Sequence, residues 1–218
     1  MKKAIIYYTS NKEDKKFEER VRANILSASG GLPIISVSHV PIDFGKNICV
    51  GDVGVSGFNM FRQVQIALNN TDADLVISTE ADCLYPPCYF QFTPRRDDIC
   101  YRTHNLYVMP DKRAFYFHKK EGATHAQIVG RTFYLQRLEE LFKGAPEWST
   151  KEVNFPRERG LGVDIFTDIE YYDLKDPVVQ IKTHKGMRYY THSDRTPIYN
   201  LPFWGDGRDF RSKYLYGK

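Results

Sequence analysis

A short apolar run that ends in two carboxylates and a double proline is the feature that most constrains this chain. Residues Leu75–Ile77 favour a buried strand, and Glu80 and Asp82 follow within five residues. Pro86-Pro87 then prevents the strand from continuing. Because side chains two residues apart in an extended chain point to the same side, both carboxylates are expected to face one direction.

Two interpretations of this acidic pair are open. A buried strand that ends in Glu80 and Asp82 would place them at the carboxyl edge of a sheet, where open α/β folds bind ligands. A hard divalent cation carrying a substrate diphosphate would relieve their mutual repulsion. The alternative is a solvated acidic turn after a strand, since turns favour Asp.

The first forty residues predict a β-α-β unit. Residues 4–8 favour a buried strand, and Ser10 and Glu13 match a capping box with Ser10 as the N-cap. The predicted helix carries apolar side chains at helical spacing, namely Phe17, Val21, Ile25 and Ala28. A second strand is expected within 33–39. The unit fits a right-handed parallel crossover and the start of a nucleotide-binding half-fold.

A glycine-rich segment at 40–57 precedes a second predicted helix at 58–68. The segment has no G-x-G-x-x-G fingerprint and no Walker lysine, which argues against a nicotinamide site or a P-loop. We expect the amino end of the helix to face a phosphate or a ribose, with Asn59 and Arg62 as contacts. The alternative for Arg62 is an ordinary surface cation.

The second half of the chain predicts strands at 99–109, 114–118 and 178–183 and a helix at 132–143. A loop is expected over 144–164, and 187–191 is expected to form a hairpin with the last strand. The tail, 200–218, is rich in aromatic residues and arginine and is expected to be irregular.

Composition adds little about function but bears on location. The net charge of +4 is too small to identify a polyanionic partner. The four cysteines, at 49, 83, 88 and 100, form no C-x-x-C pair, which favours reduced thiols. The apolar run near the N-terminus is too short for a signal sequence or a membrane span. We therefore expect a cytoplasmic protein with no membrane partner.

The order of these parts resembles the GT-A fold glycosyltransferases, which take sugars from nucleotide-diphosphate sugars. The matching segments are IIYYTS, PIISVS, GVSGFNMFRQVQIAL and ADLVISTEADCLYPP. They cover the first 95 residues, and the remainder matches loosely. The resemblance implies a single α/β domain over 1–218, with a Rossmann-like mixed sheet flanked by helices. A nucleotide-sugar-binding half would span 1–95 and an acceptor-side half 96–218.

The resemblance also implies a metal site and a donor site. Its acidic motif is usually D-x-D, so Glu80 departs at the first position and Asp82 is the expected ligand of Mn²⁺ or Mg²⁺. A late histidine, His184, is the expected further ligand, although a lone histidine at a strand end is often structural. The expected contacts of the donor, most simply a UDP-sugar, are Tyr8, Thr9, Ser10, Asn11, Glu13, Asn59, Arg62, Glu80, Lys185 and Arg188.

A general base is harder to choose. An inverting enzyme needs a carboxylate that accepts the proton of the acceptor hydroxyl. The loop offers Glu147, Glu152, Glu158 and Asp164. We select Asp164, because the preceding Gly160–Val163 allows a close approach to the substrate; a surface role is the alternative for each of these residues.

The acceptor and even the reaction class remain open. Arg95-Arg96 and the basic aromatic tail suit DNA, and small phage enzymes that glycosylate 5-hydroxymethylated pyrimidines resemble this chain; a phage protein would act in the host cytoplasm. Saccharide and protein acceptors are the alternatives. A nucleotidyltransferase is disfavoured, because residues 10–16 do not resemble its phosphate loop. A non-catalytic nucleic-acid-binding protein would use the tail as its main surface.

Overall fold

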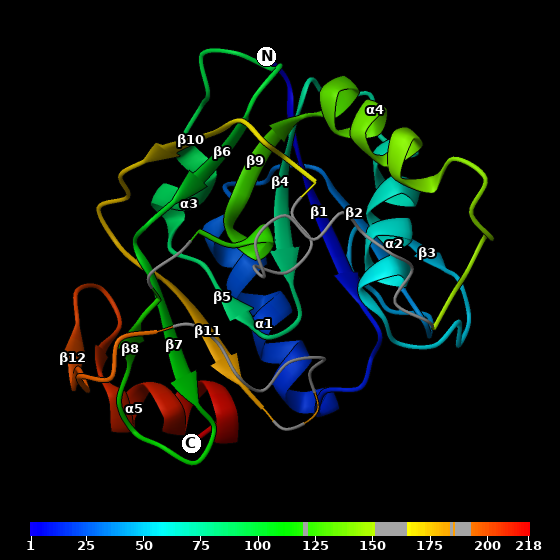
Figure 1. Cartoon of the computed structure of the whole chain (residues 1–218). Coiled ribbons are helices and arrows are strands. Elements are labelled where there is room, and N and C mark those ends of the chain that lie inside the picture. The colour runs from blue at the N-terminus through cyan, green and yellow to red at the C-terminus, as the bar shows by residue number, and fades with distance from the viewer. Residues whose placement is uncertain (120–121, 151–164, 184, 186–192) are drawn as a thin grey trace.

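A mixed β-sheet forms the centre of the computed structural model, which describes residues 1–119, 122–150, 165–183, 185 and 193–218 (Figure 1). Within these residues the sheet has seven strands, in the spatial order β10 (Ile169–Tyr172), β6 (Cys100–Thr103), β9 (Gln127–Gly130), β4 (Leu75–Glu80), β1 (Lys3–Thr9), β2 (Ile34–Ser38) and β3 (Lys46–Cys49). Strands β3, β2, β1 and β4 run parallel, whereas β9 is antiparallel to both β4 and β6. The expected mixed α/β class is confirmed.

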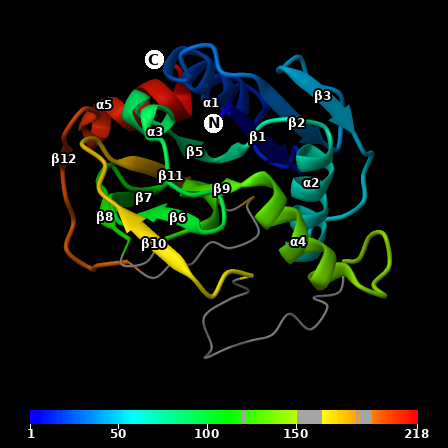
Figure 2. The ribbon, with the colours of Figure 1, turned by 90° about the horizontal axis from the view of Figure 1, so that it is seen from above.

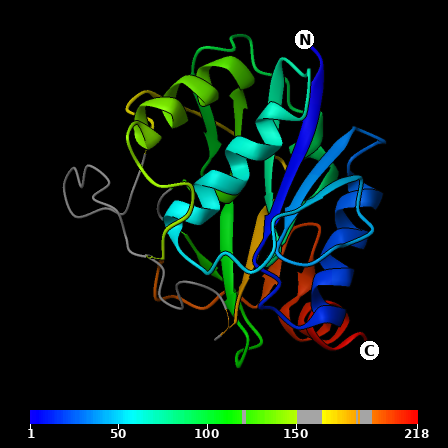
Figure 3. The same ribbon diagram turned by 90° about the vertical axis from the view of Figure 1, so that its right-hand side faces the viewer.

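Helices cover both faces of this sheet. Helix α1 (Lys15–Ala28) lies on one face, and α2 (Gly57–Asn69) and α4 (Arg131–Phe142) lie on the other, as Figures 2 and 3 show. Strand β1 is apolar from Ala4 to Tyr8 because its side chains alternate between the two covered faces. Ile5 and Tyr7 pack in the core with α1, while Ile6 and Tyr8 pack in the core with α2 and α4.

A smaller sheet extends the core on the α1 side. Its strand order is β5 (Cys83–Leu84), β11 (Val178–Lys182), β7 (Leu106–Pro110) and β8 (Phe117–His118). The single strand predicted at 99–109 is wrong, because the chain bends between β6 and β7 and enters the second sheet. The bend is fixed by Asn105, whose backbone N–H donates to Thr103 Oγ1 and whose side-chain amide donates to the carbonyl of Leu174. The predicted hairpin strand at 187–191 lies outside the described residues.

Two local predictions near the N-terminus are corrected. The N-cap of α1 is Asp14, whose Oδ1 accepts from the backbone N–H of Phe17 at 3.0 Å, so Ser10 and Glu13 form no capping box. The glycine-rich segment is not all loop, because β3 lies within it and pairs with β2. The chain also forms two short helical segments, α3 (Pro87–Gln91) and a 3-10 turn at Thr124–Ala126.

The C-terminal tail is more regular than the sequence predicted. It forms a small hairpin, β12 (Asn200–Leu201) and β13 (Gly205–Asp206), followed by α5 (Gly207–Arg211) and a π-helical turn at Ser212–Tyr216. Trp204 and Phe210 are buried in the core. The Arg20 guanidinium of α1 holds the chain end by donating to the carbonyl of Tyr214. The tail therefore owes part of its aromatic content to packing. None of the helices in the described ranges is long and apolar enough to cross a membrane.

Candidate functional site: an acidic cleft at the sheet edge

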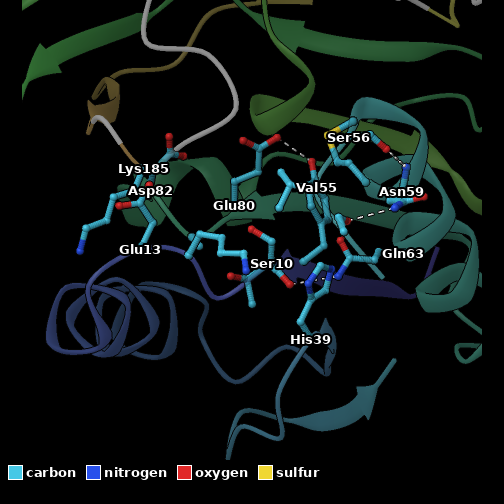
Figure 4. Close-up of a pocket in the computed structure, with 16 residues that line it drawn as sticks. Ser10, Glu13, His39, Val55, Ser56, Asn59, Gln63, Glu80, Asp82 and Lys185 are labelled. Carbon is cyan, nitrogen blue, oxygen red and sulfur yellow. Dashed lines mark hydrogen bonds between the residues drawn. The ribbon is translucent and has the colours of Figure 1, made fainter. Parts of the chain in front are cut away.

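The carboxyl ends of three parallel strands meet at one edge of the large sheet and form a cleft. The register places Tyr8 of β1 beside Val37 of β2 and beside Glu80 of β4, so the residues that follow each strand converge. The cleft measures about 630 Å³ when the part open to solvent is included. Figure 4 shows the residues that line it, which come from these strand ends and from the start of α2 and include Lys185.

Glu80 ends β4 and lines the cleft. The Tyr8 hydroxyl donates to its Oε1 at 2.9 Å, and its backbone N–H donates to the Tyr85 hydroxyl at 3.0 Å. That hydroxyl in turn donates to the carbonyl of His125. Burial, together with the charge of Asp82, raises the pKa of Glu80 to about 7, although the bond from Tyr8 and the charge of Lys182 act in the opposite direction. Glu80 can therefore accept or release a proton near neutral pH.

Asp82 also lines the cleft, so both acidic side chains reach it, although residues 81 and 82 form a turn and not the extended strand from which the shared direction was predicted. The side-chain amide of Gln180 donates to its Oδ2 at 2.9 Å, and the thiol of Cys83 donates to its Oδ1 at 3.1 Å. The Lys182 ammonium lies 4.0 Å from Oδ2. Both Gln180 and Lys182 belong to β11, so a strand of the smaller sheet holds the side chain of Asp82.

A third carboxylate, that of Glu13, joins the same cleft. The Thr183 hydroxyl, at the end of β11, donates to its Oε1 at 2.6 Å. The pKa of Glu13 is raised to about 7, mainly by burial; the bond from Thr183 opposes the rise, Asp82 adds to it, and Lys185 opposes it. Glu13 thus serves the cleft and not the helix cap that the sequence indicated.

The described residues around Asp82 already supply a positive charge, which disfavours a Mn²⁺ or Mg²⁺ ion bound directly to this carboxylate. The Lys182 ammonium lies 4.0 Å from Oδ2, and each Asp82 oxygen accepts one hydrogen bond. A different group, Glu80, Cys83 and His125, brings potential ligand atoms within 4.8 Å of one another. Its thiol and imidazole suit softer transition metals better than Mg²⁺ or Mn²⁺. Burial keeps the pKa of Cys83 high and that of His125 low.

The far end of the cleft is formed by residues that the sequence reasoning missed. His39 follows β2 directly and is only 5% exposed, yet it lines the cleft. Its Nδ1 has no hydrogen-bond partner among the described residues, and Asp52 Oδ1 lies 3.5 Å away. Lys12, also a lining residue, has its ammonium 3.7 Å from Asp52 Oδ2. The position of His39 after a predicted parallel strand was the available signal.

Thr9 and Asn11, both predicted donor contacts, are engaged with the scaffold. The Thr9 hydroxyl and the Asn11 amide donate to the carboxylate of Glu18, which also pairs with Arg22 at 3.3 Å. Asn11 Oδ1 accepts from the backbone N–H of His39. Thr9 lines the cleft together with Tyr8 and Ser10, whereas Asn11 is not among the lining residues.

Asn59 and Arg62 stabilise the loops around the start of α2. The Asn59 amide donates to the carbonyls of Val53 and Gly54, and its Oδ1 accepts from the backbone N–H of Ser149. Arg62 packs over the Phe142 ring at 3.7 Å and donates to the carbonyls of residues 146 and 147. Asn59 lines the cleft, and Arg62 is not among the residues that line it.

The remaining predicted residues have three different outcomes. Lys185 lines the cleft. Asp164, His184 and Arg188 lie outside the described residues, as do Glu152 and Glu158. Glu147 is exposed and is not among the lining residues.

No protein-family model matches the chain, and no curated protein matches it. Solved structures with a similar arrangement include the bifunctional IspDF from Campylobacter jejuni, at 10% identity and a TM-score of 0.38, over 67% of this chain and 46% of that one. TarS of S. aureus has 9% identity and a TM-score of 0.49, over 83% of this chain and 37% of TarS. A glycosyltransferase involved in glycosylation of the major capsid of PBCV-1 has 10% identity and a TM-score of 0.47, over 83% of this chain and 93% of that one.

TarS has been crystallised with UDP-GlcNAc and with UDP. This chain spans less than half the length of IspDF and of TarS. These identities and TM-scores are too low to assign a family or an activity to the chain.

Proposed function

We propose that this chain is a glycosyltransferase that moves a sugar from a nucleotide-diphosphate sugar to an acceptor hydroxyl. The proposal rests on the meeting of Glu13, Glu80 and Asp82 with Lys12 and Lys185 in one cleft at the carboxyl edge of parallel strands. Carboxylates accept hydrogen bonds from ribose and sugar hydroxyls, while lysines attract phosphate groups. A cleft of about 630 Å³, solvent-open part included, is in the size range of small-molecule sites.

The two ends of the cleft suit the two ends of such a donor. The nucleoside would lie between the end of β1, at Tyr8 to Ser10, and the ring of His39, which also lines the cleft. The diphosphate and sugar would extend toward Glu80, Asp82 and Lys185. The resemblance of the first 95 residues to GT-A fold glycosyltransferases supports the same orientation. Lysines near the phosphates would stabilise the negative charge that develops on the nucleoside diphosphate as it leaves the sugar.

The proton acceptor that the sequence favours, Asp164, remains part of the proposal, although it lies outside the described residues. If it is the base, Asp164→Asn should lower kcat by roughly a hundredfold or more, the usual contribution of a general base, and leave the Kd of the donor unchanged. Equal kcat values for Asp164→Asn and the wild type would remove it from this role.

The acceptor is the least constrained part. A 5-hydroxymethylated pyrimidine in DNA was suggested by the basic, aromatic tail, but Trp204 and Phe210 of that tail are buried. Arg208 and Lys213 are exposed and could still meet a polyanion. We therefore treat a saccharide or protein hydroxyl on equal terms with DNA.

A donor screen tests the proposal. The wild type is mixed with UDP-, GDP- and CMP-sugars, with and without Mn²⁺, and binding and release of free nucleotide are measured. We expect one donor to bind and Glu13→Gln to weaken that binding. Glu19→Gln, an exposed change on α1, is the matched control. Addition of hydroxymethylcytosine DNA or of saccharides then identifies the acceptor by faster release. Failure of every nucleotide sugar to bind would end the glycosyltransferase proposal.

A further inference from the structure

Among the described residues, Lys182 forms an ion pair with the acidic pair. Lys182, the last residue of β11, has its ammonium 4.0 Å from Asp82 Oδ2, and the side chains of both residues are only 15% exposed. An ion pair this sheltered is poorly screened by solvent, so Lys182 neutralises much of the charge of Asp82.

Backbone pairing holds this contact in place. Strand β11 runs antiparallel to β5, with Gln180 opposite Cys83, and the backbone N–H of Ile181 donates to the carbonyl of Asp82 at 2.8 Å. Gln180 and Lys182 are two residues apart on one strand, so both project toward Asp82. The lysine is therefore positioned by the sheet and not by a flexible loop.

A second lysine lies beside the same group. Lys119 follows β8, its backbone N–H donates to the carbonyl of Leu106, and it forms a bridge with Ser193. Burial lowers the pKa of Lys119 and the charge of Lys182 lowers it further, whereas Cys83, Glu80 and Asp82 raise it. The cation in contact with the acidic pair is therefore assigned to Lys182. A divalent cation added to this group would be repelled by the Lys182 ammonium.

We infer that Lys182 takes the place of a divalent metal at Glu80 and Asp82, and that a nucleoside diphosphate binds in this cleft without Mn²⁺ or Mg²⁺. The inference rests on the proposed function, since it names how that same site holds its donor. The neutralised carboxylates remain available to accept hydrogen bonds from sugar or ribose hydroxyls. Lys185 and Lys12, which line the cleft, contact the phosphates.

The test is calorimetric binding of UDP, GDP and CDP to the wild type, first in EDTA and then in Mn²⁺. We expect one nucleotide to bind with the same Kd in both conditions. Lys182→Met should weaken binding in EDTA by roughly tenfold to a hundredfold, as expected for loss of one charged contact. Mn²⁺ should partly restore binding to this variant, because the ion can then replace the missing ammonium. Lys182→Arg should bind like the wild type.

The matched control is Lys175→Met, an exposed lysine before the opposite end of β11, and its Kd should not change. Circular dichroism checks that each variant is folded, and the wild-type measurement decides the question even if Lys182→Met does not fold. Binding of the wild type only in Mn²⁺ would overturn this inference and leave the proposed function standing. Unchanged binding by folded Lys182→Met in EDTA would overturn it as well. Absence of binding in both conditions would contradict the proposed function itself.

Discussion

Replacement of Glu80 by Gln should make the protein more stable at alkaline pH. Glutamine keeps the shape of the side chain and still accepts the bond from Tyr8, but it carries no charge. In the folded protein burial raises the pKa of Glu80 from 4.5 to about 7. Below pH 4.5 the carboxyl is protonated in both the folded and the unfolded state, so it does not lower the free energy of unfolding. As pH rises toward 7, the unfolded state loses its proton first, so the folded state loses stability.

The magnitude follows from the difference between the two pKa values. A rise from 4.5 to about 7 corresponds to about 3 kcal/mol of unfolding free energy, at 1.36 kcal/mol per pKa unit. Above pH 7 the wild type bears this whole cost and Glu80→Gln bears none. The contribution of Glu13, whose pKa is also raised to about 7, is common to both proteins and cancels in the comparison.

Urea denaturation in EDTA, followed by tryptophan fluorescence between pH 4.5 and pH 8, measures the effect. The stability of Glu80→Gln relative to the wild type should rise by about 3 kcal/mol across this range. Glu19→Gln, the exposed control on α1, should show no such rise. A stability difference between Glu80→Gln and the wild type that stays constant with pH would refute the reasoning that burial and Asp82 destabilise a charged Glu80.

Two further changes test the scaffold of the cleft by urea denaturation, and a third tests the packing of the tail. Ser56→Ala removes the N-cap of α2 and the hydroxyl that donates to the carbonyl of Ser149, so the free energy of unfolding should fall by about 1 to 2 kcal/mol. The control, Ser27→Ala, changes an exposed serine of α1 and should alter this free energy little. Equal losses in the two variants would contradict the role of Ser56 as a cap. Tyr85→Phe leaves the Glu80 N–H and the His125 carbonyl without their shared partner and should cost about 1 to 3 kcal/mol, whereas no loss would show that this hydroxyl supports nothing. Trp204→Ala empties a buried site in the tail and should cost about 3 to 5 kcal/mol, and a loss under about 1 kcal/mol would mean that the tail is not part of the core.

Local sequence patterns determined the elements that carry the cleft. The apolar strands β1, β2 and β4 and the amphipathic helices α1 and α2 were predicted close to their observed bounds, because burial on one or two faces leaves a periodic pattern in the chain. The same patterns placed Glu80 and Asp82 at a strand end. They failed where a bend or a cap depends on distant partners, as between β6 and β7 and at Asp14.

The composition of the cleft was decided by tertiary structure. Glu13 meets Thr183 across 170 residues, and Asp82 meets Gln180 across 98. No local pattern links such residues, because their contact depends on the order and register of strands from two sheets. His39 became a lining residue because β2 lies beside β1, and Lys182 became the partner of Asp82 because β11 pairs with β5. The sequence alone predicted an acidic strand end, and the packing of the second sheet against it placed the Lys182 ammonium beside Asp82.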